Sequence, residues 1–185
     1  MDKGKTLYHF HGAMSVSNFT PLVVILNTLD NALVPQFEYK MWNFVTPLEN
    51  IEEGSGSFSH LQELVKELSQ EYECEDHVYF YGCKERAYEA LLHSIESGAH
   101  TLYLDNPKIS LIQEDDLDKF LSFKNLVKES FPLVYLSESF NEKNSLYKLF
   151  KKHDLEANLK FFTQKEIDPI TRIKNTLDML EKVTQ

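Results

Sequence analysis

The sequence predicts an α/β protein built around a mostly parallel six-stranded sheet. Short apolar, aromatic-rich runs alternate six times with longer amphipathic runs along the 185 residues. Val78-Tyr79-Phe80-Tyr81 and Leu133-Val134-Tyr135-Leu136 are apolar throughout, which is typical of buried central strands in a parallel sheet. Strands separated by helices of this length favour βαβ crossovers. We therefore expect a three-layer sandwich with helices on both faces of the sheet.

The strands and helices can be placed from these runs. The expected strands, in chain order, are Thr6–His11, Phe37–Val45, His77–Gly82, Thr101–Asp105, Leu133–Ser137 and Asn158–Thr163. The expected helices are Asn18–Leu33, Ser57–Tyr72, Lys84–Ser97, Glu114–Phe131, Glu142–His153 and Pro169–Val183. We expect the strands to lie in the order 2-1-3-4-5-6.

Several helix ends have a local cause. Ser57 or Ser59 can cap the first free amides of its helix. Gly98 can end a helix in the left-handed conformation, and Pro169 fits a first helical turn. The acidic segment Thr46–Ser57, with its two glycines, is typical of a surface loop, so residues 1–185 are expected to form one domain.

Composition limits the compartment and the partners. Two cysteines make no disulfide framework, no signal peptide is visible, and no apolar run approaches the roughly 20 residues of a membrane helix. We therefore expect a cytoplasmic protein without a membrane span. A formal net charge of −10 repels a phosphate backbone, so nucleic acid is not an expected partner.

A binding site is expected at one place in such a sheet. Parallel sheets bind ligands beyond the carboxyl ends of the strands where the strand order reverses, here between the first and third strands. The loops expected there run from His11 to Ser15 and from Gly82 to Glu85, and both lead into a helix N-terminus, which favours anions. The expected ligand-binding residues are Gly12, Ser15, Gly82, Lys84 and Arg86.

The order of elements resembles the core of the α/β-hydrolase family, entered at its third strand. Leu7-Tyr8-His9-Phe10-His11-Gly12-Ala13 resembles the family's His-Gly segment, whose following backbone helps to form the oxyanion hole. Val78-Tyr79-Phe80-Tyr81-Gly82-Cys83-Lys84-Glu85-Arg86-Ala87 lies where the family keeps its strand–nucleophile–helix turn, and His100–Asn106 resembles the next strand. The resemblance implies the hydrolase fold for most of the chain.

The family's catalytic residues do not match. Its turn has the pattern Gly-x-Ser-x-Gly, in which small flanking residues let the strand and the helix approach closely. Here Gly82 matches, but Lys84 takes the place of the nucleophile and Arg86 that of the second glycine. Glu138 can take the acid position, yet the loop Gln164–Pro169, where the family's histidine is expected, contains none. A conventional serine hydrolase is not expected.

Other side chains allow different chemistry. Cys83 at a helix N-terminus could act as a nucleophile, with His11 as base and Asp105 or Glu138 as orienting acid, or it could be a buried packing residue. His9 and His11 share one face of a strand, as metal ligands do, but no further histidine has a suitable setting, so we expect no metal and no cofactor.

These observations favour a binding or accessory protein, a pseudoenzyme on a hydrolase-like scaffold. Its expected partner is another protein or a second copy, with Tyr39, Met41 and Trp42 on an edge strand as one candidate interface, and a small anionic or acyl ligand is the other candidate. The alternative is an acyl hydrolase or transferase that uses Cys83 with His11. A second alternative is a flavodoxin-like or nucleotide-sugar-binding module, which shares the expected strand order.

Overall fold

The computed structural model describes residues 8–13, 20–27, 42–47, 57–97, 101–115, 132–153, 158–163 and 175. Within them, seven strands form one sheet in the order β1-β3-β2-β4-β5-β6-β7. The strands are β1 Tyr8–His11, β2 Leu22–Ile25, β3 Asn43–Pro47, β4 Val78–Cys83, β5 Thr101–Asp105, β6 Pro132–Ser137 and β7 Asn158–Phe162. Six of them run parallel, and β1 pairs antiparallel with β3 at one edge.

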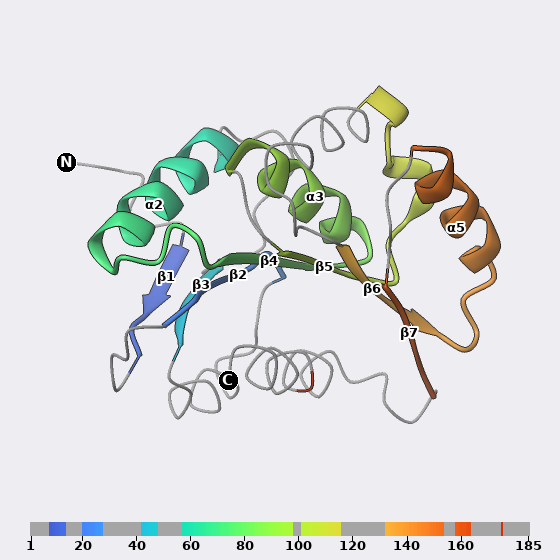
Figure 1. Cartoon of the computed structure of the whole chain (residues 1–185), viewed down its shortest axis with the longest axis horizontal. Helices are drawn as coiled ribbons and strands as arrows, with labels where there is room; N and C mark the ends of the chain where they lie inside the picture. The colour runs from blue at the N-terminus through green and yellow to red at the C-terminus, as the bar shows by residue number, and fades with distance from the viewer. Residues whose placement is uncertain are drawn as a thin grey trace.

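The described helices cover one face of this sheet. They are α2 Ser57–Glu71, α3 Glu85–Ser97 and α5 Lys143–Lys152, with a short 3-10 turn η1 at Ile109–Leu111. Figure 1 shows α2 and α5 above the two ends of the sheet and α3 between them. The mostly parallel α/β fold expected from the sequence is confirmed. The helical layer expected on the other face falls outside the described residues.

The expected strand order is correct for the six parallel strands, but its first member was assigned to the wrong segment. That place belongs to β2, which pairs with β3 on one side and with β4 on the other. Leu22–Ile25 lies inside the stretch Asn18–Leu33 that was expected to be a helix. All four residues are buried, and two of them are valines, so the segment has the character of a central strand.

Tyr8–His11, the described part of the strand expected at Thr6–His11, is therefore an additional edge strand rather than the first parallel strand. Its partner β3 begins at Asn43, later than the expected Phe37, and lies between β1 and β2 rather than at the edge of the sheet. Trp42 is only 4% exposed, which contradicts its assignment to an exposed interface. Tyr39 and Met41 lie outside the described residues, as does most of each helix expected at Glu114–Phe131 and Pro169–Val183.

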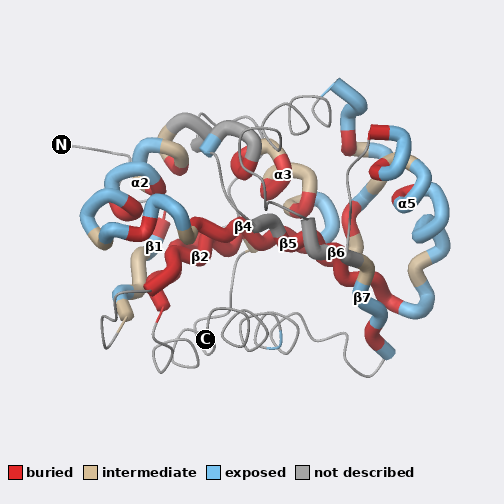
Figure 2. Tube along the Cα trace, viewed as in Figure 1, coloured by how far each residue is buried: buried red, intermediate tan, exposed pale blue. Residues whose placement is uncertain are grey.

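The sheet separates two groups of buried side chains. Leu22 and Val24 point toward α2 and α3, whereas Val23 and Ile25 point to the opposite face, as alternation along a strand requires. Figure 2 shows the strands as a continuous buried layer beneath helices that are exposed on their outer sides. On the helical face His93 stacks on Phe80, and burial lowers its pKa to about 4, so this imidazole is a neutral core residue at pH 7.

Candidate functional site

The turn between β4 and α3 contains a residue in a strained conformation. Lys84 joins the two elements with a φ of 56°, in the left-handed region that non-glycine residues seldom adopt. Its N–H donates to the Asp105 carbonyl oxygen at 2.9 Å, and its own carbonyl accepts from the Ala87 N–H at 3.1 Å. The backbone therefore turns sharply at Lys84, and the exposed side chain stands at the carboxyl edge of the sheet.

Gly82 is required by the close approach of α3 to β4. A Cβ on this residue would lie 2.1 Å from the Arg86 carbonyl oxygen and 2.5 Å from the Arg86 carbonyl carbon. Both atoms belong to the backbone and cannot rotate away. The Arg86 side chain, which was expected to bind a ligand, instead forms a double hydrogen bond with Glu89. Arg86 takes part in the turn only through its backbone carbonyl, which lies against Gly82.

Asn27 ties the end of β2 to the end of β4. Its Oδ1 accepts from the Cys83 N–H at 2.7 Å, and its Nδ2 donates to the Cys83 carbonyl at 3.3 Å. This is the reversal of strand order that was expected between the first and third parallel strands, but it is formed by β2 rather than by β1. Sequence reasoning missed Asn27 because it missed β2.

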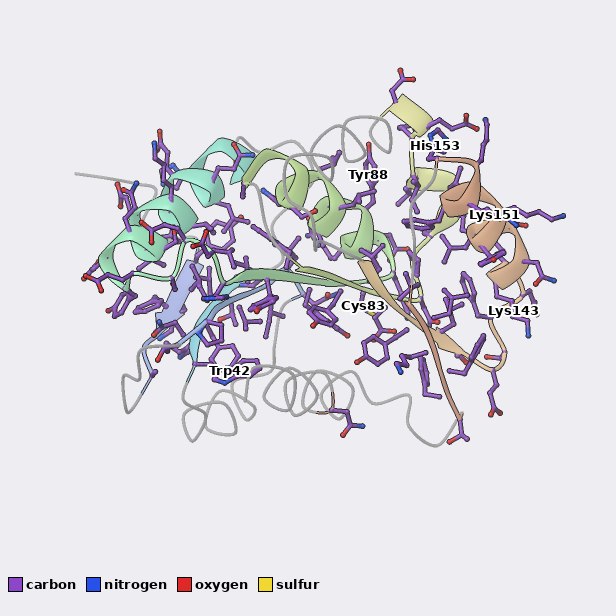
Figure 3. The ribbon with its side chains drawn as sticks, viewed as in Figure 1. Trp42, Cys83, Tyr88, Lys143, Lys151 and His153 are labelled. Carbon is purple, nitrogen blue, oxygen red and sulfur yellow. The ribbon has the colours of Figure 1, made fainter. Side chains whose placement is uncertain are left out.

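Cys83 faces away from α3, on the other side of the sheet (Figure 3). It is 6% exposed and lies directly opposite Asp105 in the register of β4 and β5. Asp105 is fully buried and accepts a hydrogen bond of 2.6 Å from the Tyr81 hydroxyl. A carboxylate beside the sulfur opposes a second negative charge there, so this setting suits a packing cysteine better than a thiolate nucleophile.

His11 is far from Cys83, which corrects the expectation that the two lie on neighbouring strand ends. The order β1-β3-β2-β4 puts three strand spacings between them, about 14 Å at roughly 4.8 Å each. Because β1 is antiparallel, His11 pairs with Phe44 near the amino edge, whereas Cys83 ends β4 at the carboxyl edge. The His11 ring contacts Thr46 Oγ1 at 3.3 Å, and its centroid lies 4.2 Å from that of the His9 ring, with the two ring planes tilted by 41°. It is not placed to serve Cys83 as a base.

The loop after β1 also lies at the amino edge of the sheet, away from the turn after β4. Gly12 is exposed at the amino edge and is remote from Gly82 and Lys84, so the five expected ligand-binding residues do not form one site. Ser15 lies outside the described residues. A groove of about 540 Å³ opens at the same edge of the sheet, between α2 and the first residue of β4, Val78. It lies a full strand length away from Lys84.

Comparison with solved structures identifies the fold. A protein of unknown function from Agrobacterium tumefaciens, named as an α/β-hydrolase candidate, superposes with a TM-score of 0.66 at 12% identity, over 95% of this chain and 89% of that one. A serine hydrolase homologue from Coxiella burnetii gives 0.63 at 10% identity, over 92% and 88%. The capsule O-acetyltransferase of Neisseria meningitidis serogroup A gives 0.62 at 12% identity, over 92% and 90%. This chain has the α/β-hydrolase fold.

At these identities the likeness concerns the fold alone. No protein-family model matches the sequence, and no curated protein does. In the α/β-hydrolase fold the nucleophile stands on the strained turn between a central strand and the following helix. In this chain that turn is Gly82–Arg86, and the residue with the left-handed φ is Lys84. The sharp strand-to-helix turn is present in this chain, with Lys84 at its left-handed position.

The first residue of α3, Glu85, follows Lys84 at the helix N-terminus. In α/β hydrolases one oxyanion donor is the backbone N–H of the residue after the nucleophile, which here is Glu85. The pKa of the Glu85 carboxyl is lowered chiefly by a hydrogen bond from its own backbone N–H, and further by Lys108, whose Nζ lies 3.4 Å from Oε1. An anionic group at this helix N-terminus must therefore compete with the Glu85 carboxylate.

The remaining catalytic positions differ as well. Glu138, which the resemblance placed in the role of the acid, follows β6 as an exposed residue, and its N–H donates to the Phe162 carbonyl at 3.1 Å. After β7 the chain continues from Thr163 into residues that the structure does not describe, and the sequence has no histidine beyond His153. His153 is buried at the C-terminal end of α5, 3.7 Å from Glu114.

Neither a metal nor a membrane site emerges from the described part of the chain. No group of three or more His, Cys, Asp or Glu side chains in it is arranged to hold a metal ion. The same residues include no helix with the length and apolar content needed to cross a bilayer. Glu114 forms an ion pair with Lys152.

Proposed function

We propose that this chain is a non-catalytic binding or accessory protein on the α/β-hydrolase fold. One observation carries the proposal: the residue on the nucleophile turn is Lys84, held at a φ of 56°. A lysine side chain is a cation at neutral pH and lacks the lone pair that attack on a carbonyl requires. The sequence supplies no histidine after the last strand to act as the base of a triad.

The neighbouring groups support the same proposal. The Glu85 carboxylate places a negative charge near the N–H that would stabilise an oxyanion, whereas in an enzyme this donor must be open to the developing charge. Loss of one such donor typically costs about 100- to 1,000-fold in turnover. The alternative enzyme, with Cys83 as nucleophile and His11 as base, is not supported, because the two residues lie at opposite edges of the sheet.

The test is whether any residue of the chain carries out acyl transfer. The purified protein is incubated with p-nitrophenyl acetate and, separately, with a fluorophosphonate probe, and then examined by intact-mass spectrometry. We expect no turnover above that of the Lys84→Ala variant and no adduct. Hydrolysis that is lost in Cys83→Ser but kept in the matched control Cys74→Ser would contradict the proposal and restore the cysteine enzyme. Both cysteines are buried and neither forms a disulfide bond with a described residue, so the pair is a fair comparison.

A further inference from the structure

A basic and aromatic stripe lies on the outer side of α5. Lys143, Tyr147 and Lys151 recur every four residues and so share one side of the helix. Tyr147 is 51% exposed, and Lys143 Nζ lies 5.4 Å above the ring of Phe161, a β7 residue that is itself 55% exposed. Figure 3 shows Lys143 and Lys151 at the β7 end of the molecule. We call Lys143, Tyr147, Lys151 and Phe161 the basic stripe.

The charge of this stripe is opposite in sign to the net charge of the chain. The ten residues of α5 contain four lysines and no acidic residue, whereas the chain has a net charge of −10. Of the four, Lys152 pairs with Glu114, and neither lysine of the basic stripe forms an ion pair with a described residue. The two exposed aromatic rings favour a contact with another protein surface, because aromatic side chains are enriched in interfaces.

A complementary stripe lies on α2. Glu63, Glu67 and Glu71 recur at the same four-residue spacing, are all exposed, and form no ion pair within the described residues. We call them the acidic stripe. The two helices lie on the same face of the sheet at its opposite ends, with their exposed sides outward (Figure 2).

We propose that the basic stripe of one copy binds the acidic stripe of a second copy, so that the chain associates head to tail. The proposal rests on the binding role proposed above and names its partner. Eight helical residues rise about 12 Å, so Lys143 and Lys151 have the spacing of Glu63 and Glu71 and can face them, with Tyr147 opposite Glu67. The Tyr147 and Phe161 rings would lose water in the same contact.

The contact uses different surfaces on the two copies. Such a heterologous interface does not close on itself in a dimer, because each added copy still presents one free stripe of each sign. Exposed ion pairs contribute little individually, so association is expected only at high protein concentration, at roughly 0.1–1 mM. It is expected to weaken as salt rises from about 0.1 M to 0.5 M, because ions screen exposed charges.

The test is sedimentation velocity on the full chain over this concentration range. Lys143→Gln with Lys151→Gln, and separately Glu63→Gln with Glu71→Gln, are each expected to be monomeric. An equimolar mixture of the two double variants is expected to form a dimer and nothing larger, because the neutral stripes do not attract each other and one intact pair of stripes remains. The control Lys108→Gln with Lys160→Gln changes the net charge as much as the α5 variant does, lies outside both stripes, and is expected to associate like wild type.

Three results would overturn the inference. They are a wild-type protein that stays monomeric at about 1 mM in 0.1 M salt, an α5 double variant that associates like wild type, and a mixture that stays monomeric. Monomeric wild-type protein that binds an acidic peptide through α5 would assign the basic stripe to a separate partner. Ester hydrolysis at Cys83 would instead contradict the proposed function, and it would not change what the sedimentation experiment says about association.

Discussion

The turn after β4 and the end of β1 teach different lessons about this fold. Both are strand ends near a glycine, and both were expected to line one crevice. The β4 turn lies at the carboxyl edge of the sheet. There Lys84 has a left-handed backbone, Gly82 lies close to the backbone of Arg86, and Cys83 forms two backbone hydrogen bonds with the Asn27 side chain, which accepts one and donates the other. The β1 end is at the amino edge, and Gly12 has ordinary contacts only. Tight constraints are found where the α/β-hydrolase fold keeps its nucleophile.

At the turn after β4 the backbone resembles that of the α/β-hydrolase fold, whereas the side chains do not. The α/β-hydrolase turn persists here in φ, in helix–strand approach and in strand order. The side chains on it are a lysine cation and a glutamate that caps its own amide. A fold can keep its shape while the groups that would perform its reaction are replaced.

The two glycines provide the largest expected contrast. Gly82→Ala would push a Cβ to 2.1 Å from the Arg86 carbonyl oxygen, and we expect it to lower the free energy of unfolding by about 3 kcal/mol or more. In Gly12→Ala the nearest atom is Phe10 Cε1 at 3.6 Å, so a change within about 0.5 kcal/mol is expected. Urea denaturation of both variants measures this. Equal losses would show that the β4 turn is not the tighter of the two.

The side-chain hydrogen bonds of Asn27 and Thr46 give the next largest contrast. Asn27→Ala leaves the Cys83 N–H and carbonyl without their partners and is expected to cost about 2 kcal/mol of unfolding free energy. Thr46→Val removes only a 3.3 Å contact with a half-buried His11 ring, so we expect a loss of about 0.5 kcal/mol or less. The same urea titrations measure both. A larger loss of unfolding free energy for Thr46→Val than for Asn27→Ala would show that the hydrogen bonds between β2 and β4 are not the more stabilising ones.

The sequence predicted the fold well and the site only in part. The positions of β4, β5, β6, β7 and of the helices α2, α3 and α5 follow from apolar periodicity, and Gly82 and Lys84 were found from the turn pattern. Leu22–Ile25 was missed because a short apolar run looks the same in a buried strand and a buried helix. The two valines and the preceding Pro21 were the available signal for a strand.

That single error displaced the rest of the site. Once Thr6–His11 was taken as the first parallel strand, His11 and Gly12 were placed beside Cys83, and Asn27 was hidden inside a helix. The direction of β1 could not be read either, because hydrophobic alternation is the same in parallel and antiparallel strands. The self-capping of Glu85 depends on side-chain geometry at one helix end, which no spacing pattern encodes.

The smallest effect is the most direct test, because it reports the conformation of residue 84 through the sign of a difference. At a φ of 56° a glycine is free of the Cβ strain that an alanine suffers, so we expect Lys84→Gly to be more stable than Lys84→Ala by about 1 kcal/mol in urea denaturation. Lys84→Gly less stable than Lys84→Ala by roughly 0.5–1 kcal/mol, the order found in ordinary helices and strands, would contradict the account, since no nucleophile turn would then exist at this position.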